Sequence, residues 1–154
     1  KLSTAIDSIY LFPSQVFGDL KELDFSSLKF AKADIYIGWL TRNDVELPIL
    51  KRFVFPATLK QLKLSNAQSE VVDLSRCTHL KSLYVDDSRT GERAIKKLIL
   101  PKNLKKSDFK RQHKSEFEND YAFKLSDINN ETVIENLPSW VENDGNGTYS
   151  VPND

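Results

Sequence analysis

The chain has 154 residues, 40% of them hydrophobic, and its 22 basic and 22 acidic side chains give a formal net charge of zero. That length suits one domain with a sizeable core, and the nine Phe residues argue against intrinsic disorder. No run approaches the roughly 20 apolar residues that a membrane span needs, and no secretory leader opens the chain. The chain also contains no Met, which indicates a processed or excised form.

Two strands are predicted before residue 26. Residues 6–11 and 20–25 each place apolar side chains at the first, fourth and sixth positions. Since successive residues of a strand alternate between its faces, the fourth and sixth positions share a face and point into a core. Residues 26–49 form the longest connection between strands. Within it, residues 35–40 predict a short strand or helical turn, and Trp39 either packs on the flank or contacts a partner.

A repeat organises the middle of the chain. Residues 50–59 return as residues 95–104, with a weaker copy at 71–80, so that the copies start 21 and then 24 residues apart. This period is typical of leucine-rich repeats and related β-solenoids. Pro56 and Pro101, which lack a donor N–H, are expected to end a strand in two of the copies. Each copy contains two predicted strands, at 50–55 and 59–64, at 71–74 and 80–85, and at 95–100 and 104–109.

Stacking explains why such a repeat folds. One turn of the chain cannot bury its own apolar edge, whereas stacked turns lay their strands side by side around a common core. Leu62, Leu83 and Leu98 are expected to face that core. The alternative is a set of six unrelated amphipathic strands in an ordinary mixed domain.

Residues 50–59 and 77–85 resemble the leucine-rich repeats of the BspA type, and Ala122-Phe123 is similar to the Ala-Phe pair of that pattern. Residues 73–80 are similar to the repeat units of internalin-like bacterial proteins. Arg76 and Ser107 depart from the pattern, since they stand at expected apolar positions. The resemblance covers about residues 6–125 and implies a bacterial surface or host-facing role.

The end of the chain is less regular. Residues 110–120 are strongly charged and predict a loop or a short exposed helix, and Val133, Ile134 and Leu137 indicate one last turn. Residues 140–151 predict a hairpin, because their centre is rich in the Asn and Gly that tight turns use. We therefore predict a β-rich (α/β) solenoid, a leucine-rich-repeat-like right-handed stack over residues 1–125 with an insertion at 26–49. A C-terminal cap or hairpin and a linker follow at 126–154.

Charge is distributed unevenly along the chain. Residues 93–114 carry nine bases against Asp108 alone, whereas nine acids and only Lys124 as a base follow from Glu116 onward. The basic stretch predicts either a polyanion site or a surface that its own acidic neighbour covers. The second strand of each copy suggests a column of Lys60, Lys81 and Lys105 for an acidic partner. The predicted partner-binding residues are Lys60, Lys63, Lys81, Tyr84, Lys105 and Lys106.

Few residues suggest catalysis. His79 and His113 have no metal-ligand spacing with a second His or Cys, and the lone Cys77 excludes an internal disulfide. Cys77 is expected to be a small buried apolar residue. Residues 142–147 resemble a calcium loop only weakly and favour a hairpin turn, and Asn130 and Asn146 begin glycosylation triplets. We expect no enzyme activity, cofactor or metal.

The leading hypothesis is a non-enzymatic protein-binding module, secreted or at the cell surface, with a role in recognition or adhesion. The alternative is a leucine-rich-repeat substrate-recognition segment of a larger enzyme or ubiquitin-ligase-type receptor, with a cytoplasmic location. A third possibility is binding of a polyanion or glycan, whereas a nucleic-acid partner is not favoured. Fold alone does not decide among these functions.

Overall fold

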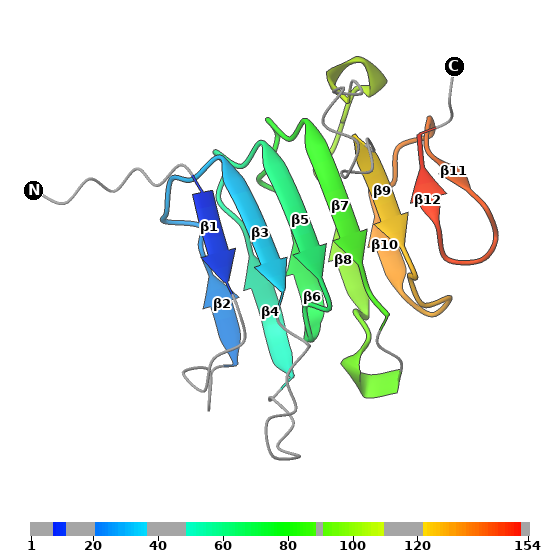
Figure 1. Ribbon diagram of the computed structural model, residues 1–154, viewed down its shortest axis with the longest axis horizontal. Coiled ribbons are helices and arrows are strands. Elements are labelled where there is room, and N and C mark those ends of the chain that lie inside the picture. The colour runs from blue at the N-terminus through cyan, green and yellow to red at the C-terminus, as the bar shows by residue number, and fades with distance from the viewer. Residues whose placement is uncertain (1–7, 12–20, 37–48, 89–90, 110–121, 152–154) are drawn as a thin grey trace, which may run out of the picture.

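The computed structural model describes residues 8–11, 21–36, 49–88, 91–109 and 122–151. These residues form two β-sheets, and the helices among them are two short 3-10 turns, η2 (Gly91–Arg93) and η3 (Lys106–Asp108) (Figure 1). In the described part of the chain, no helix has the length and the hydropathy that crossing a membrane requires.

The two sheets differ in size. The larger sheet has the order β1 (Ser8–Leu11), β3 (Lys32–Tyr36), β5 (Gln61–Ser65), β7 (Ser82–Asp86), β9 (Phe123–Ser126), β12 (Tyr149–Ser150) and β11 (Glu142–Asn143). The smaller sheet has the order β10 (Val133–Glu135), β8 (Lys97–Ile99), β6 (Ser69–Asp73), β4 (Leu50–Val54) and β2 (Glu22–Asp24).

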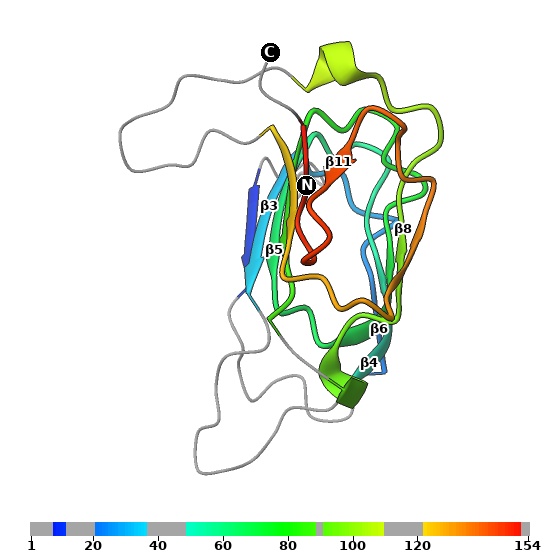
Figure 2. The same cartoon turned by 90° about the vertical axis from the view of Figure 1, so that its right-hand side faces the viewer.

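The chain alternates between these sheets. From β1 to β10, each strand lies in the sheet opposite to its predecessor. Each strand from β1 to β8 pairs in parallel with the strand two places further along. Figure 2 shows the result from one end, with the two sheets facing each other across the space that the core fills. Only the last two strands of the larger sheet, β12 and β11, pair antiparallel.

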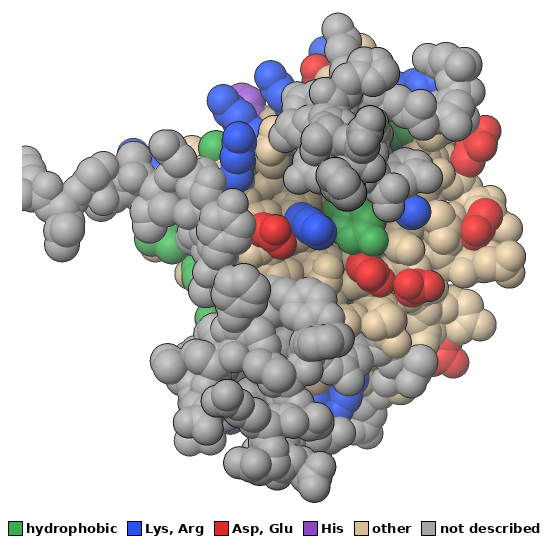
Figure 3. Space-filling model, in the orientation of Figure 1, with side chains coloured by type: hydrophobic (Ala, Val, Ile, Leu, Met, Phe, Trp, Pro, Cys, Tyr) green, Lys and Arg blue, Asp and Glu red, His purple; other side chains and the backbone are tan. Residues whose placement is uncertain are grey.

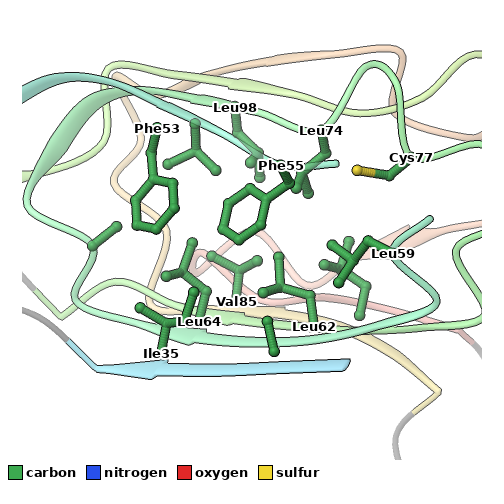
Figure 4. Close-up of a cluster of buried hydrophobic side chains, with 14 of the residues drawn as sticks. Ile35, Phe53, Phe55, Leu59, Leu62, Leu64, Leu74, Cys77, Val85 and Leu98 are labelled. Atoms are coloured by element: carbon green, nitrogen blue, oxygen red, sulfur yellow. The ribbon is translucent and has the colours of Figure 1, made fainter. Parts of the chain in front are cut away.

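Register lines up the apolar residues of the core. Leu62 of β5 pairs with Leu83 of β7, which pairs with Phe123 of β9, and all three side chains are buried. Leu98 is buried in the opposite sheet. Figure 4 shows this arrangement, with side chains of the larger sheet pointing toward Phe53, Phe55 and Leu98 of the smaller one. The prediction that Leu62, Leu83 and Leu98 share one core is therefore confirmed.

Aromatic residues fill both ends of the core. Phe53 and Phe55 stack with ring centroids 4.5 Å apart, and Phe25 meets both rings edge-on. At the other end, Trp140 packs on Phe109 and Phe123, and its indole Nε1 donates a hydrogen bond to the carbonyl of Leu104 at 3.0 Å. Such edge and offset contacts add to the free energy of burial.

Most of the predicted strands are present. Seven predicted strands overlap strands of the structure. In chain order these are β1, β2, β4, β5, β6, β7 and β8, which correspond to the predictions at 6–11, 20–25, 50–55, 59–64, 71–74, 80–85 and 95–100. The prediction of a strand at 104–109 is wrong, because η3 occupies that segment. In a strand, residues 107 and 109 would share one face, so the Ser107 hydroxyl would point into the core beside Phe109. The 3-10 turn instead leaves Ser107 exposed while Phe109 is still buried.

Two other expectations concern the regions between repeats. The segment 26–49 contains β3, which pairs with β1 and β5, whereas Trp39 lies outside the described residues. The expected boundary after residue 125 falls within β9. Residues 110–120 also lie outside the described part, while Val133 and Ile134 of the expected last turn lie in the strand β10.

The C-terminal hairpin is confirmed. Strands β11 and β12 pair antiparallel, and the turn between them contains Gly145 and Gly147 with φ of 81° and 89°. A Cβ on Gly147 would lie 2.5 Å from the carbonyl oxygen of Ile128, so that only glycine fits there. The Asp144 Oδ1 atom accepts hydrogen bonds from the backbone N–H groups of Asn146 and Thr148, which explains the turn without calcium. Residues 152–154 lie outside the described part.

Leu83→Ala should lower the free energy of unfolding by about 2–5 kcal/mol, because it removes a fully buried side chain and leaves a cavity. Val133→Ala is the control, since Val133 is a strand residue with 56% of its surface exposed. Its expected cost is below about 0.5 kcal/mol. Urea denaturation measures both, and equal costs would mean that the register of the core is wrong.

Candidate partner-binding surface

The outer face of the larger sheet carries a row of charged and aromatic side chains. Asp34 of β3 pairs with Lys63 of β5, Lys63 with Tyr84 of β7, and Tyr84 with Lys124 of β9. We call these four residues the outer row. Their neighbours along each strand are buried, so that alternation directs the outer row away from the core. The predicted neighbours Lys63 and Tyr84 are thus directly opposite each other.

Lysines gather where the strands of this sheet begin. Lys60 and Lys81 come just before β5 and β7, and the Lys81 N–H donates to the Lys60 carbonyl at 2.8 Å. Lys32 begins the neighbouring strand β3, and all three side chains are exposed. We call Lys32, Lys60 and Lys81 the lysine edge. Figure 3 shows basic side chains and a histidine along the upper rim of this face.

The predicted column of Lys60, Lys81 and Lys105 is only partly correct. Lys60 and Lys81 are adjacent, but they come just before their strands, at the end of the sheet where the strands begin, and not on its outer face. Lys105 precedes η3, and Lys106 is its first residue, because the strand expected at 104–109 is absent. The place beside β7 belongs to β9 instead, which puts Lys124 opposite Tyr84.

Ion pairing distinguishes the two sides of the molecule. Arg52 pairs with Asp73, Lys96 with Glu70 at 3.3 Å and Lys97 with Glu135 at 2.9 Å, all on the side of the smaller sheet. Among the described residues, Lys32, Lys60, Lys63 and Lys81 have no carboxylate partner at ion-pair distance. Within the described part of the chain, these four lysines of the larger sheet therefore take part in no ion pair.

Two carboxyl groups lie together at the opposite end of the same strands. Asp86 ends β7 opposite Ser126, and Asp127 follows directly with a φ of 54°. Burial, the charge of Asp127 and a hydrogen bond between the two carboxyl groups raise the pKa of Asp86, whereas Lys124 lowers it. The Asp86 Oδ1 atom is inaccessible and accepts no hydrogen bond from any of the described residues. We call Asp86 and Asp127 the carboxylate pair.

Tyr84 lies between the lysine edge and the carboxylate pair. Its ring is partly buried, and burial followed by the charges of Asp86 and Asp127 raises the pKa of its phenol. The hydroxyl therefore stays protonated at neutral pH and can donate a hydrogen bond. A partly buried ring with a polar edge suits a contact surface.

Asp86→Asn should stabilise the protein at pH 7, because it removes a charge that the folded state disfavours. A raised folded-state pKa contributes stability below the ordinary Asp pKa, and that contribution is lost as pH rises through the folded-state value. The gain at pH 7 should be at most about 1 kcal/mol, since solvent screens a partly exposed group. Denaturation at pH 7 and pH 3 measures it. A gain that does not shrink at pH 3 would contradict this origin.

Groups that could support catalysis are few in the described part of the chain. His79 is exposed in the turn before Leu80, and His113 lies outside the described residues. No cluster of three or more His, Cys, Asp or Glu side chains that could hold a metal is found among the residues described. Asn130 and Asn146, which begin the two glycosylation triplets, are exposed.

Cys77 should react slowly with thiol reagents. Its side chain is fully buried, as predicted, and burial together with the charge of Asp73 raises the pKa of the thiol to about 12. The nucleophilic thiolate is therefore scarce at pH 8. Ellman's reagent should react at the unfolded rate only after urea is added, and fast reaction of the native protein would contradict the burial of Cys77.

Sequence reasoning missed the carboxylate pair and Lys124. The alternation in residues 123–126, with Phe123 and Leu125 buried and Lys124 outward, could have placed Lys124 on the outer face. Comparisons with protein-family models, curated proteins and solved structures find no match to this chain.

Proposed function

We propose that the chain is a non-enzymatic binding module that recognises an acidic protein partner through the lysine edge and the neighbouring outer row. The observation that carries this proposal is the lack of local ion-pair partners for Lys32, Lys60, Lys63 and Lys81 among the described residues. Exposed cations that remain unpaired keep their interaction energy for a partner and attract it over a Debye length of about 8–10 Å.

The repeat supports an elongated binding platform. We propose that the alternating parallel strands belong to a leucine-rich-repeat-like solenoid with a right-handed course. Support comes from the buried Phe55, Leu74 and Leu100, which recur directly after successive strands of the smaller sheet, and from the parallel pairing of alternate strands. Stacked repeats of this kind present extended surfaces to partners. The surface or host-facing role that the sequence resemblance implies is part of the same proposal.

The acidic stretch predicted to cover the basic surface is described only from residue 122 onward. There the chain forms β9, β10, β11 and β12, which extend the two sheets sideways. These strands leave the lysine edge exposed. In the described part of the chain, no carboxylate therefore competes with an acidic partner for Lys60 and Lys81.

Lys60→Glu/Lys81→Glu should weaken binding of a fluorescent hexaglutamate peptide about tenfold at low salt, because both adjacent charges are reversed. Fluorescence anisotropy at several salt concentrations measures this change. The wild-type affinity should also fall steeply with salt, since the contacts are exposed to solvent.

Lys21→Glu/Lys51→Glu is the matched control. These two exposed lysines lie on the side of the smaller sheet, and the Lys51 N–H donates to the Lys21 carbonyl at 2.7 Å, as Lys81 does to Lys60. The net charge of both variants is therefore the same, and the control should change the affinity by less than about twofold. Equal loss in both variants would mean that net charge, and not the lysine edge, governs binding.

A further inference from the structure

The larger sheet has oppositely charged ends. Lys81 precedes β7 and Asp86 ends it, so that one strand runs from the lysine edge to the carboxylate pair. A rise of about 3.3 Å per residue puts these two ends about 17 Å apart. Figure 3 shows basic side chains along the upper rim of this face and acidic side chains lower down, over β7 and β9.

The carboxylate pair repels the polyanion that the lysine edge attracts. Asp127 is exposed and Asp86 is partly exposed, so both charges reach the surface that a partner covers. Burial and then the charge of Asp127 raise the pKa of Asp86, and the Asp86 Oδ1 atom has no hydrogen-bond partner among the described residues. A ligand that is acidic throughout would add a third negative charge there.

A cation would relieve this repulsion. An ammonium or guanidinium group supplies several N–H donors and no acceptor, so that it can donate to both carboxylates at once. Lys124 lies beside Asp86 and lowers its pKa, yet burial and Asp127 outweigh that effect. The end of β7 therefore favours a basic group from a partner.

We propose that the partner is an extended polypeptide segment that lies along β7 and carries an acidic group at one end and a basic group about five residues further on. The acidic group contacts Lys60 and Lys81, and the basic group contacts Asp86 and Asp127. Tyr84 packs against the segment between them. This inference rests on the function proposed above, which it narrows from any acidic partner to a bipolar polypeptide.

Two capped, labelled peptides test the proposal by fluorescence anisotropy. The bipolar peptide is Glu-Glu-Ser-Ser-Ser-Lys-Lys, and the acidic peptide replaces its two lysines with serine. The wild-type protein should bind the bipolar peptide about fivefold more tightly than the acidic one, because two further exposed charge pairs form. In Asp86→Asn/Asp127→Asn, this advantage should fall below about twofold, since Asn keeps the shape and loses the charge.

Glu22→Gln/Glu70→Gln is the matched control, because Glu22 is exposed, Glu70 is partly exposed, and both belong to strands of the smaller sheet. It should retain the fivefold advantage. A third peptide, Glu-Glu-Ser-Ser-Ser-Glu-Glu, tests the wild-type protein without any substitution. It should bind the wild-type protein no more tightly than the acidic peptide does, although its negative charge is larger.

The outcomes separate the two proposals. Equal binding of the bipolar and acidic peptides, or an advantage that survives in Asp86→Asn/Asp127→Asn, overturns the bipolar partner while the lysine edge remains a binding site. If the all-acidic peptide binds most tightly, the bipolar partner is likewise overturned and the lysine edge remains a binding site. Failure of all three peptides to bind overturns both proposals.

Discussion

Parallel register between alternate strands is the constraint on which the rest of the structure depends. The pairing of Leu62 with Leu83 and of Leu83 with Phe123 lines up the core, and the same register sets Lys63 opposite Tyr84. A slip of one residue would turn Lys63 toward the core and Leu62 toward solvent, because side chains alternate along a strand. The composition of the outer face is therefore a consequence of how the core packs.

Polar side chains hold this register where the chain passes between the sheets. Asp24 and Asp73 each accept a hydrogen bond from the backbone N–H two residues later, at 2.9 Å. Hydrogen bonds from the side chain and backbone of Ser26 lower the pKa of Asp24. Burial raises the pKa of Asp73, but hydrogen bonds from Ser75 and Arg52 outweigh it and lower the pKa. At the next corner, buried Asn66 accepts two hydrogen bonds from Ser88, and buried Asp87 accepts one from the Ile95 N–H. Because buried backbone donors need partners, these side chains fix where each turn ends.

The sequence predicts local alternation well and long-range pairing poorly. The spacing of Leu50, Phe53 and Phe55 identifies a strand from neighbouring residues alone, and that strand is β4. Which strand lies beside β7 depends on residues far apart in sequence, since β9 begins 37 positions after Asp86 ends β7. Because Leu104 and Phe109 are apolar, the sequence predicted a strand at 104–109 beside β7. Lys105 was therefore expected on that strand, next to Lys81. For the same reason, the sequence alone does not show that Asp86 and Asp127 lie together, because this depends on the pairing of β7 with β9.

The two faces differ because their charges are satisfied differently. Arg52 and Lys97 lie in one row of the smaller sheet, and each pairs diagonally with a carboxylate in the next row, Asp73 or Glu135. A partner that covered those pairs would desolvate four charges without forming new contacts, which is unfavourable. On the larger sheet, Lys32, Lys60, Lys63 and Lys81 form no ion pair among the described residues, and we propose that they and the carboxylate pair are contacted by complementary groups of a partner. The same fold thus carries paired charges on the face of the smaller sheet, and we propose that the face of the larger sheet is the one that receives a partner.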